Sequence, residues 1–134
     1  MTIQLGTTLR NAMIGQYETT VGTSPKLQIR TGAAPADCAA ADSGTLLAEL
    51  ALPSDWMTAA TAGAISKNGA WSVAATGAGN GAHYRLKNTA ANVCHEQGTV
   101  TASGGGGDMT LDNVSIAVGQ TVTVTQWDRT QGGA

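Results

Sequence analysis

The sequence has no phenylalanine, and aromatic residues make up only 4% of its 134 residues. A hydrophobic core must therefore be filled by Ala, Val, Leu and Ile together with the three tryptophans. Small aliphatic side chains favour a thin β-sandwich or barrel over a bulky α/β core. The length fits one domain with one core, which buries roughly 70% of the surface that the unfolded chain exposes.

Charge is also scarce. Charged residues make up 12% of the chain, about half of the usual ~25%, and the net charge is −2. Nucleic acid is not expected as a partner, because phosphate binding needs clustered Lys and Arg. A surface with so little charge suits a protein whose surface is largely covered by neighbouring protein molecules.

No apolar run approaches the ~20 residues of a membrane-spanning helix, so no membrane association is expected. The N-terminus lacks the basic start and apolar stretch of a secretory signal, which predicts a soluble protein made in the cytoplasm. Cys38 and Cys94 are too few and too far apart for a disulfide framework or a CxxC metal site. A reducing cytoplasm favours free thiols, and a bridge between the two is the less favoured alternative.

The clearest structural pattern lies in residues 104–131, where two runs of alternating apolar and hydroxyl side chains flank a turn at 118–120. Val122, Val124 and Trp127 recur near every second residue, as in a strand with one buried face. This pattern predicts a β-hairpin. The threonines that alternate with these residues form a neutral outer row, which is also a possible contact face.

Two other hairpins and two single strands are predicted upstream. Residues 26–30 and 45–52 alternate as strands, and residues 64–67 and 70–73 flank Asn68-Gly69, the favoured pair for a type I′ turn. Residues 82–88 and 93–101 predict a further hairpin.

The register of the 82–101 hairpin has two alternatives, since a slip of one residue turns every side chain over. One register places Arg85 opposite Glu96 as an ion pair. The other is preferred because it buries the apolar residues better, and it leaves the basic side chains and both histidines on the outer face. This register puts Cys94 and Val100 on the face of Tyr84 and Leu86.

The single helix is predicted over residues 7–20, with a threonine as its N-cap. Leu9, Met13 and Tyr17 recur every four residues, and Ala12 lies on the same stripe. The helix either packs on its own domain or acts as a docking arm on a partner. The first alternative is favoured, because short amphipathic helices owe most of their stability to tertiary packing.

Together these elements predict an all-β fold: a jelly-roll-like or other antiparallel β-sandwich or barrel of about eight strands with one N-terminal helix. The chain is expected to form a single domain over residues 1–134. Its N-terminal arm and helix occupy residues 1–22, the β domain residues 26–127, and a flexible tail residues 128–134.

Only His83, Cys94, His95 and Glu96 suggest a reactive site. Cys94 and His95 are neighbours on a strand and point to opposite faces, so they do not converge on zinc or form a cysteine–histidine catalytic pair. The aspartates lie in turn-like segments without EF-hand spacing. No catalytic, cofactor-binding or metal-binding residue is therefore predicted, and the protein is expected not to be an enzyme.

Four segments of the sequence are distinctive. They are Thr-Leu-Arg-Asn-Ala at 8–12, Gly-Ala-Ala-Pro-Ala at 32–36 with Cys-Ala-Ala-Ala-Asp at 38–42, Leu-Pro-Ser-Asp-Trp-Met at 52–57 and Gly-Asp-Met-Thr-Leu-Asp-Asn at 107–113. These segments resemble small proteins encoded among the virion genes of tailed bacteriophages and prophages. Within that group, compact all-β proteins that decorate or cement the capsid shell are the most similar in size and composition.

The resemblance implies a structural role in the virion, with the major capsid protein as partner and a homo-oligomer, a dimer or trimer, as the working form. Contact elements are expected in residues 1–17, in the 32–44 loop and in the glycine-rich loops. Trp56 packs in the core, which is favoured, or anchors an interface. The candidate contact residues are Leu5, Leu9, Arg10, Met13, Tyr17, Pro35, Asp37 and Trp56. The alternative function is a tail or adhesion module that stacks host glycans on exposed aromatic rings.

Overall fold

The computed structural model describes residues 3–134, and within them it has one helix and eleven strands. The all-β fold with one N-terminal helix is therefore confirmed, with more and shorter strands than the sequence predicted. Residues 1 and 2 of the predicted N-terminal arm lie outside the described residues. The elements are α1 (Thr7–Val21), β1 (Lys26–Arg30), β2 (Leu46–Ala51), β3 (Ala64–Ser66), β4 (Ser72–Ala74), β5 (Gly79–Asn80), β6 (His83–Lys87), β7 (Cys94–Ala102), β8 (Met109–Leu111), β9 (Ser115–Ile116), β10 (Thr121–Gln126) and β11 (Asp128–Thr130).

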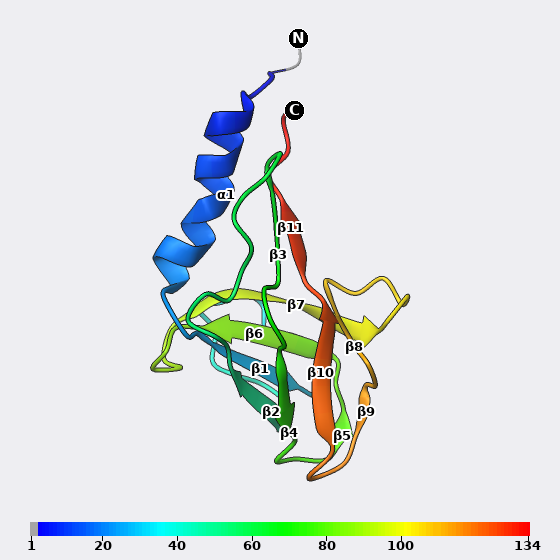
Figure 1. The fold of residues 1–134 in the computed structure, drawn as a ribbon. Coiled ribbons are helices and arrows are strands. Elements are labelled where there is room, and N and C mark those ends of the chain that lie inside the picture. The colour runs from blue at the N-terminus through cyan, green and yellow to red at the C-terminus, as the bar shows by residue number, and fades with distance from the viewer. Residues whose placement is uncertain (1–2) are drawn as a thin grey trace.

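Seven strands form one curved sheet in the order β2-β1-β6-β7-β8-β10-β4 (Figure 1). Among the described strands all pairs are antiparallel except β7 and β8, which run parallel. The two edges of the sheet meet again, because the N–H groups of Thr76 and Gly77 donate to the Leu47 carbonyl of β2 at 2.9 and 3.1 Å. The sheet is thus a nearly closed barrel.

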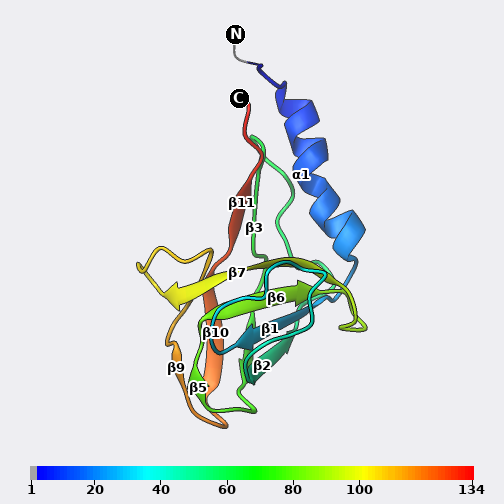
Figure 2. The same cartoon turned by 180° about the vertical axis from the view of Figure 1, so that it is seen from behind.

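A projection that we call the stalk rises from one end of the barrel (Figures 1 and 2). It consists of α1, residues 58–66 and residues 128–133, and the antiparallel ribbon of β3 and β11 is its centre. The Leu5 N–H donates to the Gly133 carbonyl at 2.6 Å, so the two ends of the described chain are joined there. Residues 128–130, predicted as part of a flexible tail, therefore form an ordered strand.

The helix packs on the ribbon with a different face from the predicted one. Arg10, Ile14 and Val21 are buried, whereas Leu9 and Met13 are 51% and 43% exposed. Arg10 can be buried because its guanidinium donates to the backbone carbonyls of Ala62 and Gln131, which flank the ribbon. The spacing of apolar residues does not predict these hydrogen bonds. The predicted threonine cap is also wrong, since Gly6 occupies the N-cap and no side chain caps the helix.

The hairpin predicted around Asn68-Gly69 does not form. β3 pairs with β11 in the stalk, and β4 pairs with β10 in the barrel. Gly69 has φ +78°, but Asn68 is not among the residues with positive φ, so the turn is not type I′. The Asn68 side chain instead donates to the Asp55 carbonyl at 3.0 Å, where the chain passes from stalk to barrel.

Of the other two predicted hairpins, the β6–β7 hairpin is confirmed and the one at 104–131 is confirmed only in part. β8 and β10 pair with Val124 opposite Leu111, and the threonines of β10 form the more exposed row. β9, the strand directly before the predicted turn, pairs with β5 and not with β10. In the β6–β7 hairpin Leu86 lies opposite Glu96, and Val100 is buried on the core side as predicted. A bulge between Leu86 and Lys87 places Cys94 opposite Lys87, so the preferred register is wrong for Cys94.

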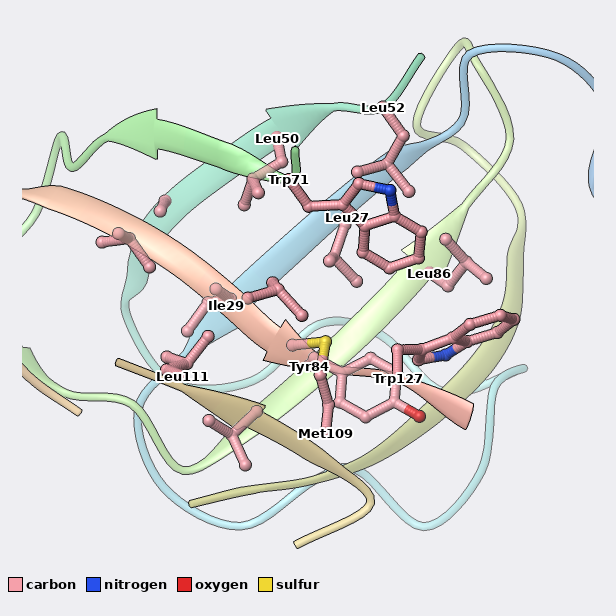
Figure 3. Close-up of a cluster of buried hydrophobic side chains, with 14 of the residues drawn as sticks. Leu27, Ile29, Leu50, Leu52, Trp71, Tyr84, Leu86, Met109, Leu111 and Trp127 are labelled. Atoms are coloured by element: carbon pink, nitrogen blue, oxygen red, sulfur yellow. The ribbon is translucent and has the colours of Figure 1, made fainter. Parts of the chain in front are cut away.

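The core fills the barrel with aliphatic side chains from β1, β2, β6, β8 and β10 (Figure 3). Trp56, Trp71 and Trp127 close it at the stalk end, with ring centroids 5.5–6.2 Å apart. These three indoles supply the volume that phenylalanine supplies in other proteins.

The glycine-rich segment 103–108 allows β8 to lie parallel to β7 after a very short connection. This segment packs directly against β7. A Cβ atom on Gly107 would lie 2.8 Å from the backbone nitrogen of Thr101, and one on Gly105 would lie 2.7 Å from the Thr101 side chain. Only glycine fits at these two positions without displacing β7.

Replacing Gly107 with alanine is therefore expected to lower the free energy of unfolding by about 1–3 kcal/mol. Gly15→Ala is the matched control, because Gly15 lies in α1 with nothing within 4 Å of the added Cβ. That change should raise stability by up to ~1 kcal/mol through helix propensity. Urea denaturation of both variants measures the difference, and equal effects would contradict the packing assigned to Gly107.

Candidate functional site

A cavity of about 690 Å³ lies between the barrel and the base of the stalk. Large concave sites are the first place to look for a ligand. Its wall comes from β6, β7, β8, β10, β11 and the glycine-rich segment. The lining residues are Tyr84, Glu96, Gln97, Gly104, Gly106, Gly107, Asp108, Thr110, Gln126, Asp128 and Arg129.

Five residues form a hydrogen-bonded group beside this cavity, which we call the Glu96 network: Glu96, Tyr17, Tyr84, Trp127 and Arg129. The Glu96 carboxylate accepts hydrogen bonds from the Tyr17 hydroxyl at 2.7 Å, the Trp127 indole N–H at 3.0 Å and the Tyr84 hydroxyl. Arg129 donates to it through Nε at 2.9 Å and Nη2 at 2.5 Å. The network thus joins the helix, the barrel and β11.

The electrostatics of the network hold every member in its ordinary protonation state at neutral pH. Burial raises the pKa of Glu96, but hydrogen bonds and charge from Arg129 and hydrogen bonds from the tyrosines outweigh this and lower it. Burial and the adjacent Glu96 raise the pKa of Tyr17 to about 12. The same causes raise the pKa of Tyr84.

This arrangement is unsuited to acid–base chemistry, because a catalytic acid or base needs a pKa near the working pH. The carboxylate oxygens already accept five hydrogen bonds, so little capacity remains for a substrate. The Glu96 network is a joint between stalk and barrel.

A second polar group lies beneath the connection of residues 31–45, on the outer face of β1 and β6. Asp42 accepts from Arg85 and Lys87 at 2.7 Å each and from Arg30 at 3.2 Å. Burial raises the pKa of Asp42, but the hydrogen bonds and charges of Lys87, Arg30 and Arg85 lower it overall. Arg85 and Lys87 were predicted on the outer face. They do lie there, but the 31–45 connection covers them and both are buried.

His83, Cys94, His95 and Glu96, the four residues considered as a reactive site, are distributed over separate places in the structure. The His83 ring contacts the Gly32 carbonyl at 2.7 Å, Glu96 lies in its network, and His95 lies beside α1 next to Met13. Within residues 3–134 no three potential metal-ligating side chains come together. In the same part of the chain, no helix has both the length and the apolarity to cross a bilayer.

The predicted contact residues divide into two groups. Arg10 and Trp56 are buried, and Tyr17 is bonded to Glu96, so these three hold the protein's own structure. Trp56 is 0% exposed, which confirms the core alternative. Leu5 and Pro35 are half-buried, and the exposed members are Leu9, Met13 and Asp37.

The Glu96–Arg129 ion pair was not predicted, since 33 positions separate its partners. The available signal was a single carboxylate in β7, at Glu96, and a single basic residue in β11, at Arg129. A stacking surface for sugars is also not formed by the tryptophans, each of which is at most 1% exposed.

The fold and the two polar groups define a barrel protein with an ordered stalk. No protein-family model matches the chain, and no curated protein or solved structure shows significant similarity to it.

Proposed function

We propose that the protein is a non-enzymatic structural protein of a tailed-bacteriophage virion, which decorates or cements the capsid shell by binding between major capsid protein subunits. The observation that carries this proposal is the uncovered apolar side of the stalk. Leu9 and Met13 of α1 are 51% and 43% exposed there, and Ile3, in the segment before the helix, is 75% exposed. Apolar side chains gathered on a projecting element are typical of a surface that a partner covers.

The exposed side of α1 has the chemistry of a helix that enters a groove. Leu9 and Met13 are four positions apart and therefore lie on one side of the helix, and Gln16 and Thr20 continue that side. These side chains are all neutral, so a partner can cover them without removing a charge from water. A neighbouring cavity of about 350 Å³, lined in part by Met13 and His95, offers space for a partner's side chain.

The shape of the molecule supports a role in bridging neighbours. The Glu96 network fixes the stalk to the barrel, from which α1 projects (Figure 1). The exposed Leu9 and Met13 are therefore held in a defined direction relative to the barrel. A binding element with a fixed direction suits repeated, symmetric contacts, and we propose a dimer or trimer as the bound form. The glycan-binding alternative has less support because the indoles are buried.

Locating the protein in purified virions tests this function. We expect copy numbers that scale with the shell, measured by quantitative mass spectrometry, and density over the joints between capsid subunits in images of the particle. A few copies confined to the tail vertex, or absence from the particle, would overturn the proposal.

The variant Leu9→Ser/Met13→Ser is expected to weaken binding to shells assembled without the protein by roughly 10–100-fold, because two apolar contacts are lost. Its melting temperature should change little, since both side chains are exposed. Val118→Ser is the matched control, because Val118 is 68% exposed in the connection between β9 and β10. That connection lies at the end of the barrel opposite the stalk (Figure 1). Equal binding by both variants and the unmodified protein would assign the contact to another surface.

A further inference from the structure

Cys38 and Cys94 lie together in the folded protein although they are far apart in the sequence. Cys38 belongs to the 31–45 connection, and Cys94 is the first residue of β7. Both line one cavity of about 330 Å³, together with Arg85 and Lys87. The bulge between Leu86 and Lys87 turns Cys94 toward this side of the sheet. Both thiols are half-buried and reduced.

The segment that carries Cys38 is held in place without a covalent bond. Arg85 donates to the carbonyls of Cys38 at 2.8 Å and Ala40 at 3.0 Å, and it forms an ion pair with Asp42. The Asp37 carboxylate accepts from the N–H groups of Ala39 and Ala40, which fixes the turn. Cys38 is therefore positioned beside Cys94 by the fold itself.

We propose that Cys38 and Cys94 form a latent disulfide site, which a two-electron oxidant such as glutathione disulfide closes within one chain. The thiolate of one cysteine attacks a sulfur of glutathione disulfide and releases one glutathione. The second thiolate then attacks the protein sulfur of the mixed disulfide and releases the other glutathione. The two protein thiols lose two electrons and two protons, and the oxidant becomes two glutathione thiols.

The surroundings of the thiols set the conditions for this reaction. Burial and the neighbouring Cys94 raise the pKa of Cys38 to about 11, although the charge of Arg85 opposes the shift. At neutral pH the Cys38 side chain is therefore mainly the unreactive thiol, and its reaction accelerates as the pH rises toward 11. A reducing cytoplasm keeps the pair open, and an oxidising exterior closes it.

Closure ties the 31–45 connection to β7. The bond encloses the chain from residue 38 to residue 94, and long enclosed segments give large reductions in the entropy of the unfolded state. The expected rise in melting temperature is roughly 5–15 °C. This inference is independent of the proposed virion function, because it concerns the stability of the free protein.

The test compares the purified protein in oxidised glutathione and in dithiothreitol, followed by acid quenching, alkylation and mass spectrometry. We expect a monomer that has lost two hydrogens, a linked pair of peptides containing Cys38 and Cys94, and a higher melting temperature that dithiothreitol reverses. The proposal is overturned if both thiols remain open to alkylation under conditions that oxidise the urea-unfolded chain, or if the bond forms only between molecules.

Three variants control this test. Cys38→Ser and Cys94→Ser should each lose the oxidation-dependent rise in melting temperature, and so should the double variant. If a variant fails to fold, the unmodified protein compared in the two buffers still decides the question. An equal rise in any folded variant would show that the stabilisation has another source.

Discussion

Glu96→Gln is expected to lower the free energy of unfolding by about 3–5 kcal/mol, because it leaves a buried guanidinium without its carboxylate. The Glu96 and Arg129 side chains are 12% and 17% exposed, so water replaces little of the lost interaction. The NH2 group of the new amide would also replace one carboxylate oxygen, so it would face either the Tyr17 hydroxyl or the Tyr84 hydroxyl and Trp127 N–H, all of which donate to Glu96. Urea denaturation measures the loss.

Asp128→Asn is the control for this prediction. Asp128 lines the same cavity but is exposed and accepts its side-chain bond from Gln126, so a change within about 0.5 kcal/mol is expected. A double-mutant cycle with Arg129→Met isolates the pair. The double variant should be less destabilised than the sum of the two single variants. Strict additivity would mean that the ion pair contributes no coupling.

The same network predicts loss of stability at both extremes of pH. The pKa of Glu96 is lower in the folded protein than its ordinary 4.5, so this contribution is present above about pH 4.5 and is lost as the pH falls through the folded value. Tyr17 behaves in the opposite way. Its pKa is raised from 10.0 to about 12, so its contribution is present below pH 10 and is lost between pH 10 and 12. In Glu96→Gln the acid dependence should be weaker.

Local sequence patterns predicted where the strands lie better than they predicted which strands pair with each other. Alternation located β1, β10 and the β6–β7 hairpin, because each has an apolar face in the core and a more polar opposite face. In β6 the 31–45 connection covers that polar face. The pairing of β3 with β11 has no such local signal, since its two strands lie at distant places in the sequence. Asn68-Gly69 suggested a nearer partner for β3, and the tertiary contacts of the stalk overrode that turn preference.

The candidate site was predicted only in part for a similar reason. Exposure of Leu9 and Met13 agrees with a contact role, but the amphipathic stripe itself pointed to the wrong face of α1. Burial of Arg10 depends on carbonyls at 62 and 131, which no periodicity reveals. The approach of Cys38 to Cys94 depends on a single bulge, and a regular register would have separated them.

The two sides of α1 in the stalk have different roles. The side of α1 that carries Arg10 and Ile14 is used for attachment to the ribbon, and Tyr17 joins the helix to the barrel. The side that carries Leu9 and Met13 has no such use within the described chain. Changes on the first side should therefore affect folding, whereas changes on the second should affect association.

Trp56 provides a sharp test of this division, because the sequence allowed it to be either a core residue or a contact anchor. Its ring packs between Trp71 and Trp127, with centroids at 6.2 and 5.5 Å, and its indole N–H donates to the Gly22 carbonyl at 2.9 Å. The residue therefore fastens the end of α1 to the core. Its loss removes packing volume and one hydrogen bond together.

Trp56→Ala is expected to lower the free energy of unfolding by about 3–5 kcal/mol, the cost of a large cavity in a core. Trp56→Phe should be less damaging, because it restores much of the volume but not the bond to Gly22. Val118→Ala is the matched control and should change stability by less than about 0.5 kcal/mol, since Val118 is exposed. Denaturant titration separates the three. A stable Trp56→Ala protein that has lost only its binding to the shell would reverse the assignment, because the indole would then act as the contact anchor.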